Sequence, residues 1–290
     1  MDAPLSRVFF PLSFQELFSA WSNNPAVLLA GGTELIRNQG RRIPVIPENI
    51  ISLDKLEELR RISRTERYLE IGPMVKLNQI VYLGKIVPEA LRRCIECIAG
   101  PQLRNLATIG GNICTPSRKL DVSGPMIALD AQYELRTAQS VRWVPASQFS
   151  SLPGPPALGP KELLTRIRVP LEPWTFTWYR KFNTAGNREA GGGILFIIRN
   201  QKNILANIRV VYSGQSILRG KDSETMLEGK RLPLEKKDAW AFVDRWKNYL
   251  SIFEGNEKLI FSGGDGNSNP ELVKAQILNF IKAAIMRISD

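Results

Sequence analysis

The chain has 290 residues, 43% hydrophobic and 23% charged, a profile typical of a globular protein with a sizeable core. It contains no histidine, which excludes histidine general bases, Ser-His-Asp triads and histidine metal ligands within the chain. Three cysteines are too few for a disulfide framework and favour a reducing compartment. No apolar run reaches the roughly 18 residues of a membrane helix, and the N-terminus does not resemble a secretory signal. We therefore expect a cytoplasmic protein with no membrane span.

The formal net charge is +11, from 39 Lys and Arg residues against 28 Asp and Glu residues. The basic residues are spread along the chain in short runs, such as 41–42, 59–64 and 91–94. Neither an RNA-binding aromatic motif nor a zinc-finger spacing accompanies them. The charge therefore favours a solvated surface, an acidic partner or an anionic cofactor over nucleic acid.

In chain order, apolar spacing predicts a helix over 12–22 and a strand over 27–30 that is covered on both faces. A strand at 50–53, a brief helix and a strand at 67–72 follow. Helices are expected at 77–83 and 89–100, the second ending at Gly100-Pro101. Later strands are expected in 126–138, 141–149, 162–170, 174–182, 193–199 and 204–214, a surface loop at 151–162, and amphipathic helices at 238–250 and 270–288.

A pair of glycines interrupts the first short strand, in the stretch "LLAGGTELI" of residues 28–36. Gly31 and Gly32 permit positive φ angles and a close approach of another group to the main chain. Thr33 and Glu34 follow, where a helix could begin. On its own this pattern favours an ordinary tight turn over an anion-binding loop, because glycine pairs are common in turns.

A second glycine pair, Gly110-Gly111, follows another apolar stretch, and Asn112 takes the place that Thr33 has after the first pair. Two such turns from separate parts of the chain could clamp one diphosphate between them. Backbone N–H groups would hold its oxygens, and hydroxyl or amide side chains would add donors. Neither pair is a G-x-G-x-x-G, so this is not a Rossmann fingerprint.

The remaining motifs do not indicate a redox, metal or nucleotide site. Cys94 and Cys97 form a C-x-x-C within an expected helix, where apolar packing is favoured over a redox or metal role. No second cysteine pair completes a zinc or iron–sulfur site. The stretch 214–222 lacks the spacing and the Ser or Thr of a phosphate-binding P-loop.

The stretches "LLAGGTELI" and "QLRNLATIGGNI" together resemble the FAD-binding subunit or domain of the xanthine dehydrogenase family of molybdenum hydroxylases. The medium subunit of carbon monoxide dehydrogenase belongs to the same family. The similarity covers about residues 8–235 and includes "PLSFQELFSAW", "LEIGPMVKLNQI", "PMIALDAQYEL", "FSSLPGPPALGPKELLTRIRVP", "YRKF" and "SGQSILRGKDSETMLEG".

The resemblance implies an α+β fold in two domains. A two-part FAD-binding domain of the PCMH (vanillyl-alcohol-oxidase-like) type is expected over residues 1–175, subdivided near residue 55. A smaller α+β domain with an antiparallel sheet and helices is expected over 176–290. The resemblance also implies that both glycine loops cradle the FAD pyrophosphate, without a catalytic side chain or a metal ligand in this chain.

Twelve cofactor-binding positions follow from the resemblance, with Asp121 contacting the cofactor and Lys181 near its flavin end. They are Ala30, Gly31, Gly32, Thr33, Glu34, Thr108, Ile109, Gly110, Gly111, Asn112, Asp121 and Lys181. Cys114 is expected to line the same pocket. Two stretches depart from the family pattern, "CTPSRKLD" before Asp121 and "NREAGGGILF" after it, and the basic residues Arg118 and Lys119 could bind phosphate or face solvent.

The implied function is electron transfer within a multi-subunit enzyme. A molybdenum–pterin centre in a large partner would oxidise the substrate, a purine by family frequency, and two [2Fe–2S] clusters in a small partner would pass the electrons on. The flavin of this chain would deliver them to NAD or another acceptor. Two alternatives stay open: a stand-alone FAD-dependent reductase on the same fold, and a docking subunit that has lost flavin.

Overall fold

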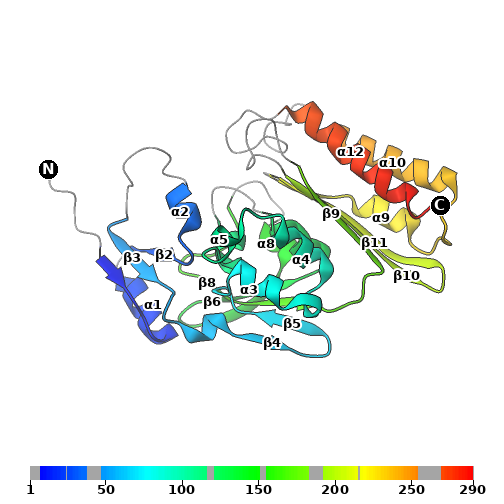
Figure 1. Cartoon of the computed structure of the whole chain (residues 1–290). Coiled ribbons are helices and arrows are strands. Elements are labelled where there is room, and N and C mark those ends of the chain that lie inside the picture. The colour runs from blue at the N-terminus through cyan, green and yellow to red at the C-terminus, as the bar shows by residue number, and fades with distance from the viewer. Residues whose placement is uncertain are drawn as a thin grey trace.

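The computed structural model describes residues 7–23, 25–37, 47–115, 121–150, 155–182, 192–214, 216–253 and 269–289. Within them the chain forms three sheets in succession along the molecule (Figure 1). The sheet of the N-terminal residues lies at one end, the C-terminal sheet at the other, and a five-stranded sheet with its helices lies between them. None of the described helices is long and apolar enough to cross a membrane.

The first sheet is parallel and has the strand order β1-β3-β2. It consists of β1 (Arg7–Phe9), β2 (Val27–Leu29) and β3 (Asn49–Ser52), with helices α1 (Phe14–Asn23) and α2 (Thr33–Arg37). Phe14, Leu17 and Phe18 of α1 are buried against β3, as the helical spacing predicts. The expectation that β2 is covered on both faces is wrong: β2 is an edge strand, and Val27 is 45% exposed.

The central sheet is antiparallel and has the order β4-β5-β8-β6-β7. Its strands are β4 (Ile62–Arg64), β5 (Tyr68–Ile71), β6 (Gln132–Arg136), β7 (Val141–Pro145) and β8 (Leu163–Pro170). The helical segments around it are η1 (Glu57–Arg60), α3 (Leu77–Tyr82), η2 (Gly84–Ile86), α4 (Glu89–Glu96), α5 (Pro101–Arg104), α6 (Ile109–Ile113), α7 (Ser123–Ala128) and α8 (Ala146–Ser150).

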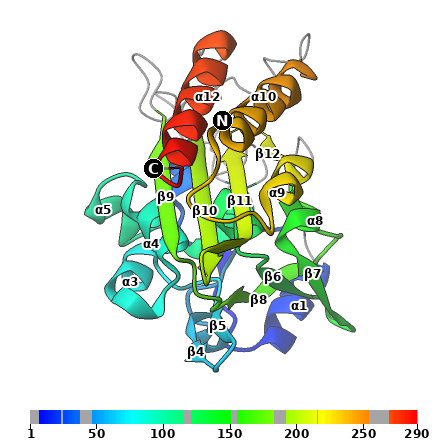
Figure 2. The ribbon, with the colours of Figure 1, turned by 90° about the vertical axis from the view of Figure 1, so that its right-hand side faces the viewer.

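The third sheet is antiparallel and has the order β12-β11-β10-β9. Its elements are β9 (Phe176–Lys181), β10 (Gly193–Gln201), β11 (Ile204–Ser213) and β12 (Ile217–Arg219), followed by α9 (Lys221–Leu227), α10 (Lys236–Ser251) and α12 (Pro270–Met286). Figure 2 shows α10 and α12 covering the outer face of this sheet. The opposite face packs on the central helices, because Tyr179, Leu195 and Val211 share one apolar cluster with α4 and α7. The division of the chain near residue 175 stays a prediction.

Three expected elements differ from the structure. The strand expected over 141–149 ends at Pro145, and residues 146–149 belong to helix α8. Residues 126–128 belong to helix α7 and not to a strand, and the strand β6 begins only at Gln132. All six residues of α7 are buried between the two sheets, so no polar face reveals its period. Pro101, which we expected only to end a helix, is the first residue of α5. Proline suits this position, because the first amide of a helix has no acceptor within the helix and the missing N–H of proline is therefore not a loss.

Candidate cofactor site

The two glycine loops meet in space. A Cβ atom on Gly31 would lie 2.2 Å from the carbonyl oxygen of Leu106, in the chain that leads into the second loop. A Cβ atom on Gly111 would lie 3.7 Å from the Cβ of Ala30. Gly31 is therefore required for the close approach of two backbones, and residues 30–31 lie against Leu106, Ala107 and Gly111.

The second loop is anchored in the protein. Gly110 is buried, and a Cβ atom on it would lie 2.4 Å from the Cβ of Pro73, which follows strand β5. Its amide donates to the Pro73 carbonyl at 2.8 Å, and the Ile109 amide donates to Val75 at 3.0 Å. The absence of a side chain at Gly110 therefore serves packing within the protein, whereas we expected it to serve the approach of a phosphate.

The next amides of the second loop are also paired. The Gly111 amide donates to the Thr108 hydroxyl, and the Asn112 amide donates to the Thr108 carbonyl, both at 3.0 Å. Thr108 thus caps the short helix α6 with its side chain. Four successive amides are consumed in this way, so they hold the loop rigid and do not stand ready for a ligand.

The first loop has the amides that the second loop lacks. No described residue accepts a hydrogen bond from the amides of Gly31, Gly32 or Thr33. Gly32 has a φ angle of +70°, a conformation that favours glycine, and it immediately precedes helix α2. Donors on this side of the contact between the loops are therefore available for an anion.

A chain of contacts connects the second loop to the last two predicted positions. The side-chain oxygen of Asn112 accepts a hydrogen bond from the Val122 amide at 3.3 Å, next to Asp121. The Lys181 ammonium lies 3.2 Å from the Asp121 carboxylate, and both side chains are largely buried. These contacts link Ala30 and Gly31 of the first loop, through the second loop and Asn112, to Asp121 and Lys181. Gly32, Thr33 and Glu34 continue the first loop into α2, and the assignment of the twelve positions to a cofactor stays a prediction.

Two residues that the sequence interpretation did not assign to the site adjoin this ion pair. The thiol of Cys94, on α4, donates to the backbone carbonyl of Asp121 at 3.3 Å. The Tyr179 ring lies across Gly193, because a Cβ atom there would come 2.2 Å from the tyrosine hydroxyl. The absence of a side chain at Gly193 thus makes room for a tyrosine. Neither contact has a signal in the sequence, since both depend on pairing between distant elements.

The three thiols are poorly suited to chemistry at neutral pH. Burial raises the pKa of Cys94 well above its ordinary value, raises the pKa of Cys97, and raises the pKa of Cys114 to about 12. In the described part of the chain, no group of three Cys, Asp or Glu residues could hold a metal ion. Arg118, Lys119 and residues 183–191 lie outside the described residues.

Comparison with known proteins defines the class. Residues 4–172, more than half of the chain, match the family described as the FAD binding domain in molybdopterin dehydrogenase. The chain therefore belongs to this family, and the resemblance noted in the sequence is confirmed.

Individual relatives extend the match. The xanthine dehydrogenase FAD-binding subunit of Escherichia coli O157:H7 is 35% identical over 162 residues, which cover 52% of this chain and 53% of that one. The match thus spans about half the length of that relative. The carbon monoxide dehydrogenase medium chain of Hydrogenophaga pseudoflava is 30% identical over 222 residues, covering 74% of this chain and 77% of that one.

Solved structures agree over the whole chain. A chain of carbon monoxide dehydrogenase from Hydrogenophaga pseudoflava, in a form that lacks the Mo-pyranopterin moiety of its cofactor, has a TM-score of 0.80 at 26% identity, covering 99% of this chain and 98% of that one. Quinoline 2-oxidoreductase from Pseudomonas putida 86 has the same fold, with a TM-score of 0.76 at 19% identity and coverage of 100% and 97%. The predicted α+β fold of the PCMH type is confirmed.

Proposed function

We propose that this chain is the FAD-binding electron-transfer subunit of a multi-subunit molybdenum hydroxylase of the xanthine dehydrogenase type. Its membership of the FAD-binding family supports this function. The observation that carries it is the contact of Gly31 with the Leu106 carbonyl, which joins two glycine loops from distant parts of the chain. Such a junction would bring the backbone donors of the first loop within reach of a bound diphosphate.

The residues present fit the pyrophosphate of FAD. A diphosphate carries two negative charges, and amides at a glycine turn can meet them without an intervening side chain. The amides of Gly31, Gly32 and Thr33 have no acceptor among the described residues. We assign the diphosphate to these amides and to the Thr33 hydroxyl, and we assign the second loop the role of a rigid wall.

The pair of Asp121 and Lys181 forms the other end of the site. Asp121 would accept a hydrogen bond from a cofactor hydroxyl, while Lys181 neutralises its charge and fixes its direction. When bound, FAD would supply the redox chemistry. The protein contributes binding, orientation and the electrostatic surroundings.

The partners and the acceptor belong to the same proposal. We place substrate oxidation at a molybdenum–pterin centre in a large subunit, and the electron source in the [2Fe–2S] clusters of a small subunit. NAD or another molecule would accept the electrons, in the cytoplasm. The relationship to the medium chain of carbon monoxide dehydrogenase from Hydrogenophaga pseudoflava supports a separate subunit of this kind.

Cofactor and metal analysis of the native complex tests the proposal. We expect FAD on this chain, with iron and molybdenum co-purifying on two other chains. Flavin without either metal would favour a stand-alone reductase, and metals without flavin would favour a docking subunit. Because the chain carries a net charge of +11, its affinity for the iron–sulfur subunit should fall as salt rises. Salt screens the attraction between exposed charges beyond about 8–10 Å at 0.1–0.15 M.

A further inference from the structure

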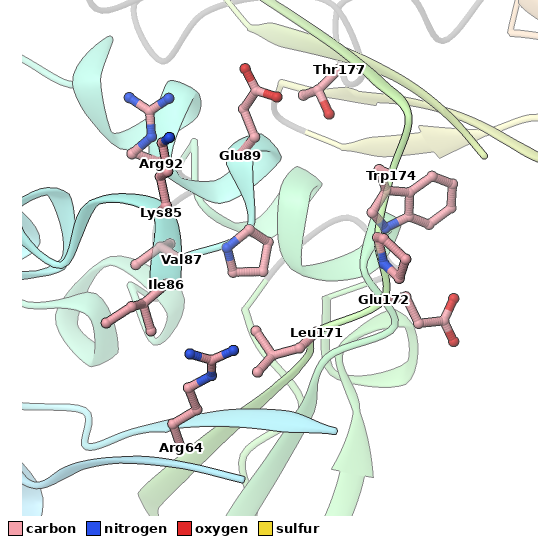
Figure 3. A pocket seen from close by; sticks show the side chains of 12 residues that line it. Arg64, Lys85, Ile86, Val87, Glu89, Arg92, Leu171, Glu172, Trp174 and Thr177 are labelled. Carbon is pink, nitrogen blue, oxygen red and sulfur yellow. The ribbon is translucent and has the colours of Figure 1, made fainter. Parts of the chain in front are cut away.

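A cleft lies apart from the glycine loops. It has a volume of about 440 Å³ and opens where β8 leads through residues 171–175 into β9 (Figure 3). Its walls come from β4, from the segment of η2 and α4, and from the connection to β9. None of the twelve predicted cofactor positions lines it. Its volume lies within the roughly 300–1,000 Å³ of small-molecule sites.

The body of the cleft is apolar. Ile86 and Val87 lie on one side, and Leu171 and Trp174 lie on the other (Figure 3). Val87 is buried, whereas Ile86 is 40% exposed although it is a large aliphatic side chain. Two facing apolar walls favour a flat apolar group between them over a fully hydrated ion.

The two acidic side chains at the cleft are neutralised by partners that do not line it. Glu172 lies 3.2 Å from Arg199, and Glu89 lies 2.7 Å from Arg93. In Figure 3 the carboxylate of Glu172 points away from the cleft. These acids therefore contribute little negative potential to an occupant.

The basic side chains at the cleft are in excess. Arg92 is paired with Glu96 at 2.6 Å, on the same helix. No described residue lies within ion-pair distance of Arg64 on β4 or Lys85 on η2. These two side chains supply positive potential at the rim, which attracts an anionic group and not a cationic one.

One hydroxyl group also lines the cleft. Thr177 on β9 is only 6% exposed as a whole residue. Its side-chain oxygen is not among the buried atoms that lack a partner in the described part of the chain, so it is accessible from the cleft. It adds a polar group at one end of the cleft.

We propose that this cleft binds a small organic anion that has one carboxylate on a flat apolar body, such as an aromatic carboxylate. The apolar body would lie between Val87 and Leu171, and the carboxylate would face Arg64 at one end of the cleft. Lys85 and Thr177 lie toward the other end (Figure 3). Because the walls belong to α4 and to the connection into β9, an occupant would bridge the central unit and the C-terminal sheet.

Isothermal titration calorimetry with 2-naphthoate tests this site on the full chain. We expect one saturable site per chain, with an affinity that falls as salt rises. The neutral analogue 2-naphthylmethanol should bind at least about tenfold more weakly, because it lacks the charge that Arg64 and Lys85 attract. Equal binding of the two compounds, or no saturation by 2-naphthoate, would overturn the proposal.

Matched variants locate the binding. The double variant Arg64→Gln/Lys85→Gln should weaken 2-naphthoate binding about tenfold or more, because the carboxylate loses the positive charge that it faces. The control Lys55→Gln/Arg61→Gln removes the same charges from exposed residues outside the cleft and should change the affinity less than about twofold. Unchanged binding in Arg64→Gln/Lys85→Gln, with an intact fold by circular dichroism, would assign the compound to another place and refute the site.

Discussion

The ammonium group of Lys181 and the carboxylate of Asp121 lie 3.2 Å apart, although 60 positions separate them in the sequence. Their side chains are only 16% and 15% exposed, so water screens this pair poorly. Lys181 ends strand β9, and Asp121 precedes helix α7. The pair therefore ties the edge of the C-terminal sheet to the segment that leads away from the second glycine loop.

Breaking this pair should cost both stability and flavin. Asp121→Ala and Lys181→Met should each lower the free energy of unfolding by roughly 1–3 kcal/mol, because each leaves a partly buried charge without its partner. The double variant should lose less than the sum of the two. Asp121→Ala should weaken FAD binding by roughly three- to thirtyfold.

Urea denaturation and quenching of flavin fluorescence measure these effects. The exposed pair Arg93–Glu89 serves as the control cycle, with an expected coupling of only about 0.3–0.5 kcal/mol. A coupling between Asp121 and Lys181 no larger than that value would remove the pair from the site.

Two glycines should be intolerant of alanine for reasons of packing. In Gly31→Ala the new Cβ would collide with the Leu106 carbonyl, and in Gly110→Ala it would collide with Pro73. Because backbone atoms must move, we expect losses of roughly 1–3 kcal/mol in the free energy of unfolding, and loss of flavin in both variants. Thermal unfolding and the ratio of flavin to protein absorbance after gel filtration measure them.

Gly100→Ala provides the matched control. Its new Cβ would approach only the side-chain oxygen of Gln102, which is the end of a flexible chain. Full flavin retention in Gly31→Ala and Gly110→Ala would refute the packed junction of the two loops.

Glu162 makes the free energy of unfolding depend on pH in the acid range. Arg142 donates two hydrogen bonds to it, at 2.6 and 2.7 Å, and these hold the pKa of the Glu162 carboxyl below its ordinary 4.5 although burial opposes the shift. A depressed pKa in the folded state means that the stabilisation is present above about pH 4.5 and is lost as the pH falls through the folded value. Acid unfolding should therefore be shallower in Glu162→Gln than in the wild type.

Circular dichroism between pH 7 and pH 3 measures this slope. Glu66→Gln removes an exposed carboxyl and should leave the slope unchanged. Identical slopes for Glu162→Gln and the wild type would contradict the assignment.

The thiols should differ sharply in reactivity. At pH 8 the Cys114 thiol, with its pKa raised to about 12 by burial, is ionised in only about one molecule in 10⁴. Cys94 is buried, whereas Cys97 is exposed. Titration with dithionitrobenzoate should modify one thiol in the folded protein and three in denaturant, and Cys97→Ser should abolish the first reaction. Modification of Cys94 in the folded protein would contradict its packing against Asp121.

Much of the fold can be predicted from periodicity, because a helix that exposes one face to solvent has polar residues on that face and apolar residues on the other. The helices at 236–251 and 270–286 each bury one face on the C-terminal sheet, so their apolar spacing reveals them. Helix α7 lies between two sheets and is buried all round, and its pattern is therefore ambiguous. Pro125 and the apolar run after it give a strand-like appearance that tertiary packing overrides.

The site is predictable to the level of residue types but not of contacts. The two glycine pairs and their polar neighbours are visible in the sequence, and the structure brings Gly31 to Leu106. What the sequence does not contain is the pairing of the amides: those of Gly110 and Gly111 bind acceptors in Pro73 and Thr108. Only the three-dimensional arrangement therefore distinguishes the loop with available donors from the loop that supports it.

The most direct test of the central claim compares Gly32→Ala with Gly84→Ala. Both glycines have positive φ angles, +70° and +60°, and a new Cβ would meet little in either place, so both variants should lose about 1 kcal/mol of stability. Only Gly32 belongs to the loop with available amides. The FAD dissociation constant of the reconstituted protein should rise at least about tenfold in Gly32→Ala and less than twofold in Gly84→Ala. Equal constants in the two variants would contradict a diphosphate site at the first glycine loop.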